Sequence, residues 1–368
     1  MEDVFRFADE FGPLKLVHIW RPSLGLKAIV AVDNIACGPA VGGVRMAPDV
    51  SAEEAFRLAR AMTLKNAAAG LPYGGGKSVI FADPKILPAD KERLIRGFAA
   101  AIADLAEYIP GPDMGTDELA MGWIRDETGR AVGLPREIGG IPLDEIGATG
   151  FGVVAAVEVA AESIGLALKG ARVAVQGFGS VGKHAARLLA GKGAVLVAAS
   201  DSKGTIADDN GLDIAALIAL KERGGSLRDY SRGRQLDGEA VIAAPCDILI
   251  PAARPDVVHR GNVARVQARI VAEGANIPCT IEAEEVLASR GVLVLPDFIA
   301  NAGGVICAAT EYRGGTEAAA FAAIDERIRA NTRAVLDTVK SANVVPRTAA
   351  LSLARERVRR AAQTRRWT

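Results

Sequence analysis

Residues 62–80 contain a cluster of three glycines that leads into a lysine. Gly74, Gly75 and Gly76 directly precede Lys77, which heads an apolar run typical of a strand. A lysine held between close-packed glycines and an apolar strand loses hydration. Lost hydration lowers the pKa of the ammonium and allows it to act as a base near neutral pH. An ordinary glycine turn that carries a surface lysine is the alternative explanation.

Lys65 and Asp113 are two further side chains that could take part in chemistry. Lys65 lies in the last turn of a helix that we predict to open with a capping box at Ser51 and to run to about Ala69, where a cation also suits the helix dipole. Asp113 follows two prolines and a glycine, which indicate a rigid loop. The spacing alone favours a different role for Asp113, as the cap of a helix that begins near Glu118.

A pair of glycines, Gly42 and Gly43, follows two predicted strands at residues 14–22 and 26–33. Paired glycines allow another backbone or a ligand to approach closely. A tight turn at a strand end is the alternative explanation for this pair.

The middle of the chain carries a dinucleotide-binding fingerprint in its required context of strand, glycine turn, helix, strand and acid. The turn lies between strands predicted at 171–176 and 194–200, and its residues are Gly177, Phe178, Gly179, Ser180, Val181 and Gly182. Its first glycine permits the tight turn, the second lets the backbone reach the pyrophosphate at the helix N-terminus, and the third permits close helix packing. Asp201 is placed to bind the adenosine ribose hydroxyls and to favour NAD, although Lys203 can soften that preference.

Alternating strands and helices continue to residue 295 and predict a doubly wound parallel sheet. Predicted strands in this region end at Ala252, Ala253 and Asn276, and ligands bind at such strand ends. Two helices, at about 317–341 and 347–363, complete the chain.

The bulk composition excludes several classes of protein. The 368 residues are too many for one average core, so we expect two domains with a boundary in the Gly- and Pro-rich residues 126–148. Lys+Arg and Asp+Glu balance at 44 each, which argues against a nucleic-acid partner. The chain has no apolar run of membrane-spanning length and no signal-peptide pattern, so we expect a cytoplasmic protein. Its four cysteines and three histidines are scattered, so we expect no metal site.

Short motifs from residue 38 to residue 304 occur in one characteristic order. They are Gly38-Pro39 with Gly42-Gly43, Met62-Thr63 with Lys65-Asn66, Gly74-Gly75-Gly76-Lys77, Pro112-Asp113, Gly147-Ala148-Thr149-Gly150, the fingerprint, Pro251-Ala252-Ala253, Gly274-Ala275-Asn276 and Asn301-Ala302-Gly303-Gly304. Together they resemble the glutamate/leucine/phenylalanine/valine dehydrogenase superfamily. The resemblance implies oxidative deamination of an L-amino acid to a 2-oxo acid and ammonia, with hydride transfer to NAD or, as a further possibility, NADP.

The resemblance also implies roles for individual residues. Lys65 would bind the substrate carboxylate, Lys77 would activate water as the catalytic lysine, and Asp113 would exchange protons with the amino group. The other implied substrate contacts are Val41, Gly42, Gly43, Gly111, Asn276, Val305 and Ala308. The implied cofactor contacts are Thr149, the six fingerprint residues, Asp201, Ala252, Ala253, Asn276 and Asn301.

The family fold implies an α/β protein with two domains. Residues 1–147 would form the substrate domain, to which the C-terminal helices at about 340–368 return. Residues 148–339 would form a Rossmann-type, doubly wound NAD-binding domain. We also expect a homo-oligomer with no membrane partner.

The branch of the family is indicated by the pocket for the substrate side chain. Glutamate enzymes place a lysine at the position of Val41 and a serine at that of Ala308, so both ligands of a side-chain carboxylate are absent here. Val41, Val305 and Ala308 make that end of the pocket apolar, which favours a hydrophobic substrate of the leucine/valine or phenylalanine/tryptophan type. Gly111 would leave room for a bulky side chain. In contrast, residues 115–118 and 273–276 look more like the glutamate branch, so a glutamate dehydrogenase remains an alternative.

Two other classes compete with this interpretation. A dinucleotide-binding regulator without catalysis is disfavoured because Lys65, Lys77 and Asp113 are all retained. A 2-hydroxy-acid dehydrogenase would generally need a catalytic histidine, and His18, His184 and His259 each lie apart from the motifs.

Overall fold

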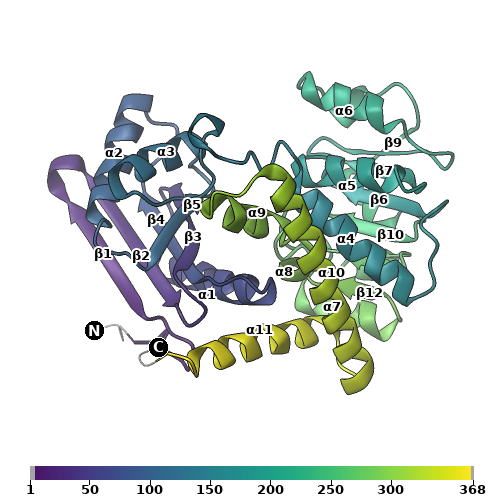
Figure 1. Ribbon diagram of the computed structural model, residues 1–368. Coiled ribbons are helices and arrows are strands. Elements are labelled where there is room, and N and C mark those ends of the chain that lie inside the picture. Colours follow the sequence, from purple (N-terminus) through teal and green to yellow (C-terminus); the bar gives the residue numbers. More distant parts are fainter. Residues whose placement is uncertain (1–4, 366–368) are drawn as a thin grey trace. The chain divides into compact units, whose positions relative to one another are not determined.

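The computed structural model describes residues 5–365, which form two compact units (Figure 1). Unit 1 comprises the chain up to Pro142, Val305–Ala320 and the chain from Ser352. Unit 2 comprises Leu143–Gly304 and Phe321–Leu351. The segment Val305–Ala320 therefore packs with unit 1, and not with the dinucleotide domain in which the family resemblance placed it.

A mixed sheet of five strands forms the centre of unit 1, in the order β1-β2-β4-β3-β5. Its strands are β1 (Lys15–Arg21), β2 (Leu26–Asn34), β3 (Ala40–Ala47), β4 (Gly74–Phe81) and β5 (Tyr108–Pro112). β3 lies between β4 and β5 and runs parallel to both, while β1 and β2 are antiparallel to their neighbours. Because the three parallel strands are adjacent, their carboxyl ends share one edge of the sheet.

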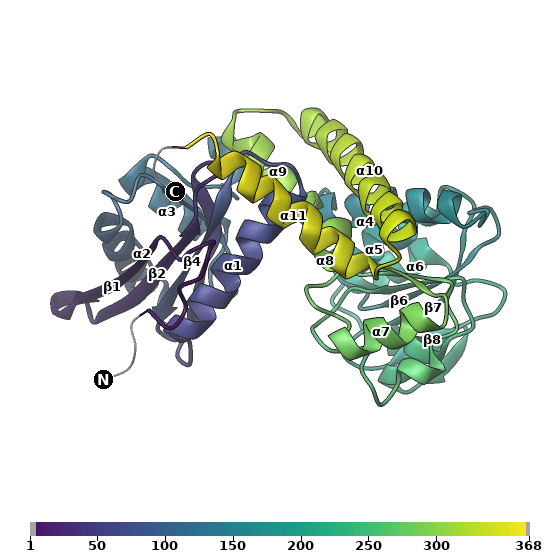
Figure 2. The same cartoon turned by 90° about the horizontal axis from the view of Figure 1, so that it is seen from below.

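Helices cover both faces of this sheet. α1 (Ala52–Ala68) packs on one face over a small core that includes Val79, and Ser51 caps it as predicted by accepting a hydrogen bond from the Glu54 N–H at 3.1 Å. The larger core lies on the other face, where α2 (Pro88–Ala101) and α3 (Glu118–Thr128) pack side by side (Figures 1 and 2). α9 (Gly303–Tyr312) belongs to unit 1 from Val305 onward.

The glycine cluster before Lys77 forms the start of strand β4, so the alternative of an ordinary glycine turn is wrong. The three glycines are required by crowding. A Cβ on Gly75 would lie 2.1 Å from the backbone nitrogen of Thr63 on α1, and a Cβ on Gly76 would lie 2.8 Å from the ring of Tyr108. A strand without side chains at these points lets α1 and β5 approach β4 closely, and this approach buries Lys77.

Unit 2 is built on the predicted doubly wound sheet, here with seven strands in the order β12-β11-β10-β6-β7-β8-β9. The strands are β6 (Arg172–Gln176), β7 (Val195–Ser200), β8 (Thr205–Ala207), β9 (Arg234–Leu236), β10 (Ile248–Pro251), β11 (Ile270–Ala272) and β12 (Leu293–Leu295). The first five in spatial order are parallel, which confirms the predicted fold class. The short strands β8 and β9 extend the sheet in antiparallel fashion, a feature that the sequence analysis did not predict.

The helices of unit 2 lie on both faces of its sheet. They are α4 (Ala148–Ser163), α5 (Ser180–Ala190), α6 (Ile214–Glu222), α7 (Ile281–Ser289), α8 (Asp297–Ala300) and, from Phe321 onward, α10 (Glu317–Ala342), together with the first residues of α11 (Pro346–Ala362). Short 3-10 helices occur at Pro22–Leu24, Arg136–Ile138, Leu227–Asp229, Gly238–Ala243 and Val263–Arg265. Figures 1 and 2 both show α10 alongside α4, where Phe151 and Phe321 meet edge to face with ring centroids 5.0 Å apart. Within residues 5–365, every helix is too short or too polar to cross a membrane.

Candidate functional site

Lys77, which is buried, and Asp113, which is half-buried, form an ion pair in unit 1. The Lys77 ammonium lies 2.8 Å from Oδ2 of Asp113, and the side chains are 7% and 22% exposed. Lys77 comes from β4 and Asp113 follows the last residue of β5. The parallel register of β3 with both strands brings two residues that lie far apart in the sequence into contact.

Asp113 does not cap the helix that follows it. Asp117 is the N-cap of α3 and accepts a hydrogen bond from the Ala120 N–H at 2.9 Å. The Asp113 backbone is held instead by Thr116, whose hydroxyl accepts from the Asp113 N–H at 3.0 Å and donates to the Val44 carbonyl at 2.7 Å. The capping role that spacing favoured is therefore wrong, and the carboxylate of Asp113 is directed to Lys77.

Arg45, which was not among the predicted site residues, completes this group. Its Nε donates to the same Oδ2 of Asp113 at 2.8 Å, and its guanidinium also pairs with Glu54 on α1. We call Lys77, Asp113, Arg45 and Glu54 the Lys77 cluster. The signal that could have revealed Arg45 is its alternation with Gly43 on β3, since residues two apart on a strand share a face.

The environment shifts both members of the ion pair. Burial lowers the pKa of Lys77, although the charge of Asp113 opposes this effect. Burial acts to raise the pKa of Asp113, but Lys77 and Arg45 outweigh it, so that pKa is lowered. Asp113 is thus ionised at neutral pH, and a larger fraction of Lys77 than of a surface lysine is present as the free amine, the form that can accept a proton.

Gly42 and Gly43 lie within strand β3, so the alternative of a tight turn is wrong. A Cβ on Gly42 would lie 1.6 Å from the Gly76 carbonyl oxygen. A Cβ on Gly43 would lie 2.7 Å from Cβ of Asp113 and 3.1 Å from the Lys77 ammonium. Gly43 therefore keeps the space beside the ion pair free of a side chain.

Lys65 lies in the last turn of α1 and is half-buried. The end of this helix is fastened to β4, since the side-chain amide of Asn66 donates to the Gly74 carbonyl at 2.6 Å. Lys65 therefore projects from a helix that covers the same sheet face as Lys77, on which Val79 also lies.

Gly111 on β5 has Val132 as its neighbour on the side where a Cβ would point. A Cβ on Gly111 would lie 3.0 Å from Cγ2 of Val132, a buried residue whose N–H donates to the Pro110 carbonyl at 2.9 Å. Val132 therefore borders the position at which room for an aromatic ring was predicted. Val132, which the sequence analysis missed, narrows this part of the unit.

The remaining residues predicted at the side-chain end lie on two elements. Val41 is half-buried on β3, two positions before Gly43 and so on the same face. Val305 and Ala308 lie three positions apart on α9 and share one side of that helix. The carboxylate of Glu311 on α9 accepts backbone hydrogen bonds from Gly133, Leu134 and Ile141 (2.7, 3.2 and 2.7 Å).

Those three bonds explain why α9 packs with unit 1. Burial raises the pKa of Glu311, although the backbone N–H groups oppose that rise.

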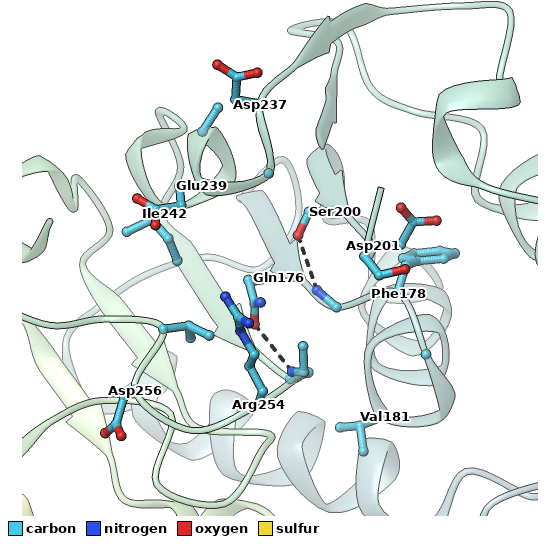
Figure 3. A pocket seen from close by; sticks show the side chains of 18 of the residues that line it. Gln176, Phe178, Val181, Ser200, Asp201, Asp237, Glu239, Ile242, Arg254 and Asp256 are labelled. Atoms are coloured by element: carbon cyan, nitrogen blue, oxygen red, sulfur yellow. Dashed lines mark hydrogen bonds between the residues drawn. The ribbon is translucent and has the colours of Figure 1, made fainter. Parts of the chain in front are cut away.

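In unit 2 the fingerprint borders a cavity of about 1160 Å³ (Figure 3). Gly177 adopts a left-handed conformation with φ +93°, and a Cβ there would lie 2.5 Å from Ala253. A Cβ on Gly182 would lie 2.1 Å from the Gly177 carbonyl oxygen, as expected for close packing of α5. Gly179 has no atom near the position of its missing Cβ, and no side chain caps α5 at this residue. An uncapped helix end that faces a cavity suits a pyrophosphate.

Backbone bonds fix the walls of this cavity. The Gly177 and Phe178 N–H groups both donate to the Ser200 carbonyl, at 3.0 and 2.8 Å. Ala252 and Ala253 donate to the carbonyl and side chain of Gln176, at 2.7 and 3.3 Å (Figure 3). Ser180 and Val181 line the cavity beside them. The residues that line this cavity are therefore suited to hold a dinucleotide.

Thr149, Asn276 and Asn301, predicted for the nicotinamide end, also lie in unit 2. The Asn301 amide donates to the Ala275 carbonyl at 2.9 Å and to the Asn276 side chain at 3.1 Å, so the structure joins two of the three. Thr149 lies in the first turn of α4, and its hydroxyl is 3.1 Å from the position of a Cβ on Gly304.

Comparison with known sequence families matches both units. Residues 139–366 match the family described as "Glutamate/Leucine/Phenylalanine/Valine dehydrogenase". Residues 18–130 match the "Glu/Leu/Phe/Val dehydrogenase, dimerisation domain".

Individual relatives agree. A glutamate dehydrogenase of Aeropyrum pernix is 41% identical over 358 residues, covering 91% of this chain and 85% of that protein. An NADP-specific glutamate dehydrogenase of Saccharolobus shibatae is 37% identical over 375 residues, covering 96% of this chain and 86% of that protein.

Solved structures are also similar. The hetero-hexameric glutamate dehydrogenase of Thermus thermophilus in a leucine-bound form superposes with a TM-score of 0.85 at 33% identity, covering 96% of this chain and 90% of that one. The L-tryptophan dehydrogenase of Nostoc punctiforme superposes with a TM-score of 0.76 at 28% identity, covering 96% of this chain and 97% of that one.

Proposed function

This chain belongs to the glutamate/leucine/phenylalanine/valine dehydrogenase family of amino-acid dehydrogenases, and we propose that it oxidatively deaminates a branched aliphatic L-amino acid such as leucine or valine. The observation that carries the proposal is the Lys77–Asp113 pair beside Gly43 on the sheet face that Val41 shares. The family uses NAD or NADP.

The roles proposed for the residues of unit 1 follow from their charges. Lys65 binds the substrate carboxylate, because a fixed cation orients the α-carbon. Asp113 is ionised and takes a proton from the substrate ammonium. Lys77, with its lowered pKa, removes a proton from the water that attacks the imino intermediate. When bound, NAD(P) accepts the hydride from the α-carbon.

In unit 2, we propose that the fingerprint residues, Ala252 and Ala253 hold the pyrophosphate and adenosine, and that Thr149, Asn276 and Asn301 contact the nicotinamide. This proposal is supported by the uncapped N-terminus of α5 at the cavity. The match of residues 18–130 to a dimerisation domain supports assembly into a homo-oligomer.

The preference for an aliphatic side chain rests on three residues. Val41 and Ala308 offer a substrate carboxylate neither a cation nor a hydroxyl, and burying an unpaired polar group costs ~2 kcal/mol or more. Since ~1.4 kcal/mol is a tenfold change in rate, this cost should lower kcat/KM for glutamate, relative to leucine, by more than about tenfold. Val132, which lies beside Gly111, disfavours a substrate with an aromatic side chain.

Glutamate is the second candidate substrate, because relatives that are 37–41% identical carry the name glutamate dehydrogenase. The two candidates are separated by measuring kcat/KM for leucine, valine, phenylalanine, tryptophan and glutamate on one preparation through NAD(P)H absorbance. We expect leucine or valine to be best and glutamate to be poor. Glutamate as the best substrate would refute the aliphatic pocket.

Two variants sharpen this experiment. Val41→Lys combined with Ala308→Ser should raise glutamate turnover relative to leucine. Val132→Ala should raise phenylalanine turnover relative to leucine, because it opens the space at Gly111. If neither variant changes the ratios, these residues do not line the pocket for the substrate side chain.

A further inference from the structure

The acid that ends β7 is occupied by partners within its own unit. Oδ1 of Asp201 accepts hydrogen bonds from the Lys203 N–H at 2.9 Å and the Ser226 hydroxyl at 3.4 Å. Oδ2 accepts from the Lys221 ammonium and the Leu227 N–H, both at 2.9 Å. A carboxylate has about four acceptor positions, and all four are used. The Asp201 side chain is 7% exposed, so it is poorly placed to bind a ribose diol as well.

Lys221 neutralises this acid and still has donors to offer. An ammonium carries three N–H donors, of which one points to Asp201. The Lys221 side chain is 27% exposed and lines the same cavity as the fingerprint. The hydroxyl-bearing Ser202 lines the cavity too. The free donors of Lys221 are therefore available to a ligand in that cavity.

Arg228 brings a second cation to the turn that follows β7. A Cβ on Gly204 would lie 2.6 Å from Nε of Arg228, so the guanidinium lies directly over this turn. Among residues 5–365, Arg228 makes no ion pair with a carboxylate. It borders a smaller hollow together with Asp237, a residue that also lines the fingerprint cavity. Asp201 and Asp237 lie on different sides of the fingerprint cavity (Figure 3).

We infer that the turn after β7 is a binding site for the 2′-phosphate of NADP(H), in which Lys221 and Arg228 bind the phosphate and Asp201 positions Lys221. An acid excludes this phosphate when its charge is free, whereas a nearby cation accommodates it. Here the acid is paired and two cations are close. The inference rests on the proposed dinucleotide site of unit 2 and predicts that the chain accepts NADP(H) as well as NAD(H).

The test measures binding of NADPH and NADH separately, by their fluorescence and without an amino acid. Wild type should bind NADPH no more than about tenfold more weakly than NADH, a difference of ~1.4 kcal/mol. Lys221→Ala should weaken NADPH binding at least tenfold and NADH binding less than threefold. Arg228→Ala should act in the same direction with a smaller effect. Arg234→Ala is the matched control, because that surface cation pairs with Asp209 at 3.2 Å.

The outcomes are distinct. NADPH binding a hundredfold weaker than NADH binding in wild type would overturn the inference, as would equal losses for both cofactors in Lys221→Ala and Arg228→Ala. If Lys221→Ala does not fold, Lys221→Gln and Arg228→Ala give the same comparison. Failure to bind either dinucleotide would instead refute the proposed function of unit 2.

Discussion

Two groups of paired charged side chains, one in each unit, differ in their balance of acids and cations. In the Lys77 cluster of unit 1, two cations meet two carboxylates. In unit 2, Arg347 faces three carboxylates, those of Glu273, Glu284 and Asp297, and we call these four residues the Arg347 cluster. The first group comes from sheet residues and α1, whereas the second fastens the start of α11.

Hydrogen bonds join Arg347 to all three acids of the Arg347 cluster. Nε of Arg347 donates to both carboxylate oxygens of Glu284, at 2.6 and 2.8 Å. Nη2 donates to Glu273 at 2.8 Å and to Asp297 at 3.1 Å. Asp297 in turn accepts from the Ile277 N–H at 2.9 Å, beside Asn276. The cluster therefore holds the loop that carries Asn276.

The difference in charge balance separates chemistry from support. Burial raises the pKa of Glu273 well above its usual value, and Glu284 adds to the rise. A raised pKa favours the neutral form of Glu273, so this acid is less suited than Asp113 to act as an ionised proton acceptor. In the Lys77 cluster the acid has a lowered pKa and the lysine has a lowered pKa, which leaves an acceptor and a base ready for proton transfer.

Removal of Lys77 should give the largest effect. We expect Lys77→Met to lower kcat by about 10²- to 10⁴-fold, the usual contribution of a general base. Binding of NADH should not change, because the fingerprint lies in unit 2. Steady-state kinetics and NADH fluorescence measure both quantities. Lys85→Met, at an exposed lysine, is the control, and a kcat within threefold of wild type would refute the role of Lys77.

Removal of Arg347 should reduce stability instead. Arg347→Met leaves three carboxylates without their cation, and loss of one partner of a buried ion pair costs about 3–5 kcal/mol. Urea unfolding should show a loss of this size, whereas Arg355→Met, at an exposed position of the same helix, should change stability by less than about 0.5 kcal/mol. A stable Arg347→Met protein would mean that the cluster does not support the fold.

Glu273→Gln should have the smallest effect and tests the protonation of the second cluster. Because the folded pKa is raised, wild type should lose stability as pH rises above 4.5, where the unfolded chain ionises first. Glutamine is neutral and similar in shape, so the variant should match wild type at pH 4 and equal or exceed it at pH 7. Thermal unfolding at both pH values checks this. A variant less stable than wild type only at pH 7 would show that Glu273 acts as an ion.

The sequence by itself determined the features that depend on neighbouring residues. Ser51 predicted the start of α1, and the spacing of glycines between two apolar runs predicted the turn at Gly177 and the helix after it. The alternation of strands and helices predicted the parallel sheet of unit 2. Such features are encoded by short-range sterics and hydrogen bonding, so a short stretch of sequence is sufficient to predict them.

Only the tertiary structure decided which side chains meet. Arg45 joins Asp113 across 68 positions of sequence, and Lys221 takes Oδ2 of Asp201 across 20. Val132 contacts the position of a Cβ on Gly111 because it lies beside β5 in the fold. Contacts of this kind depend on strand register and on burial, which change the partners and the pKa of a residue without any mark in the residues next to it.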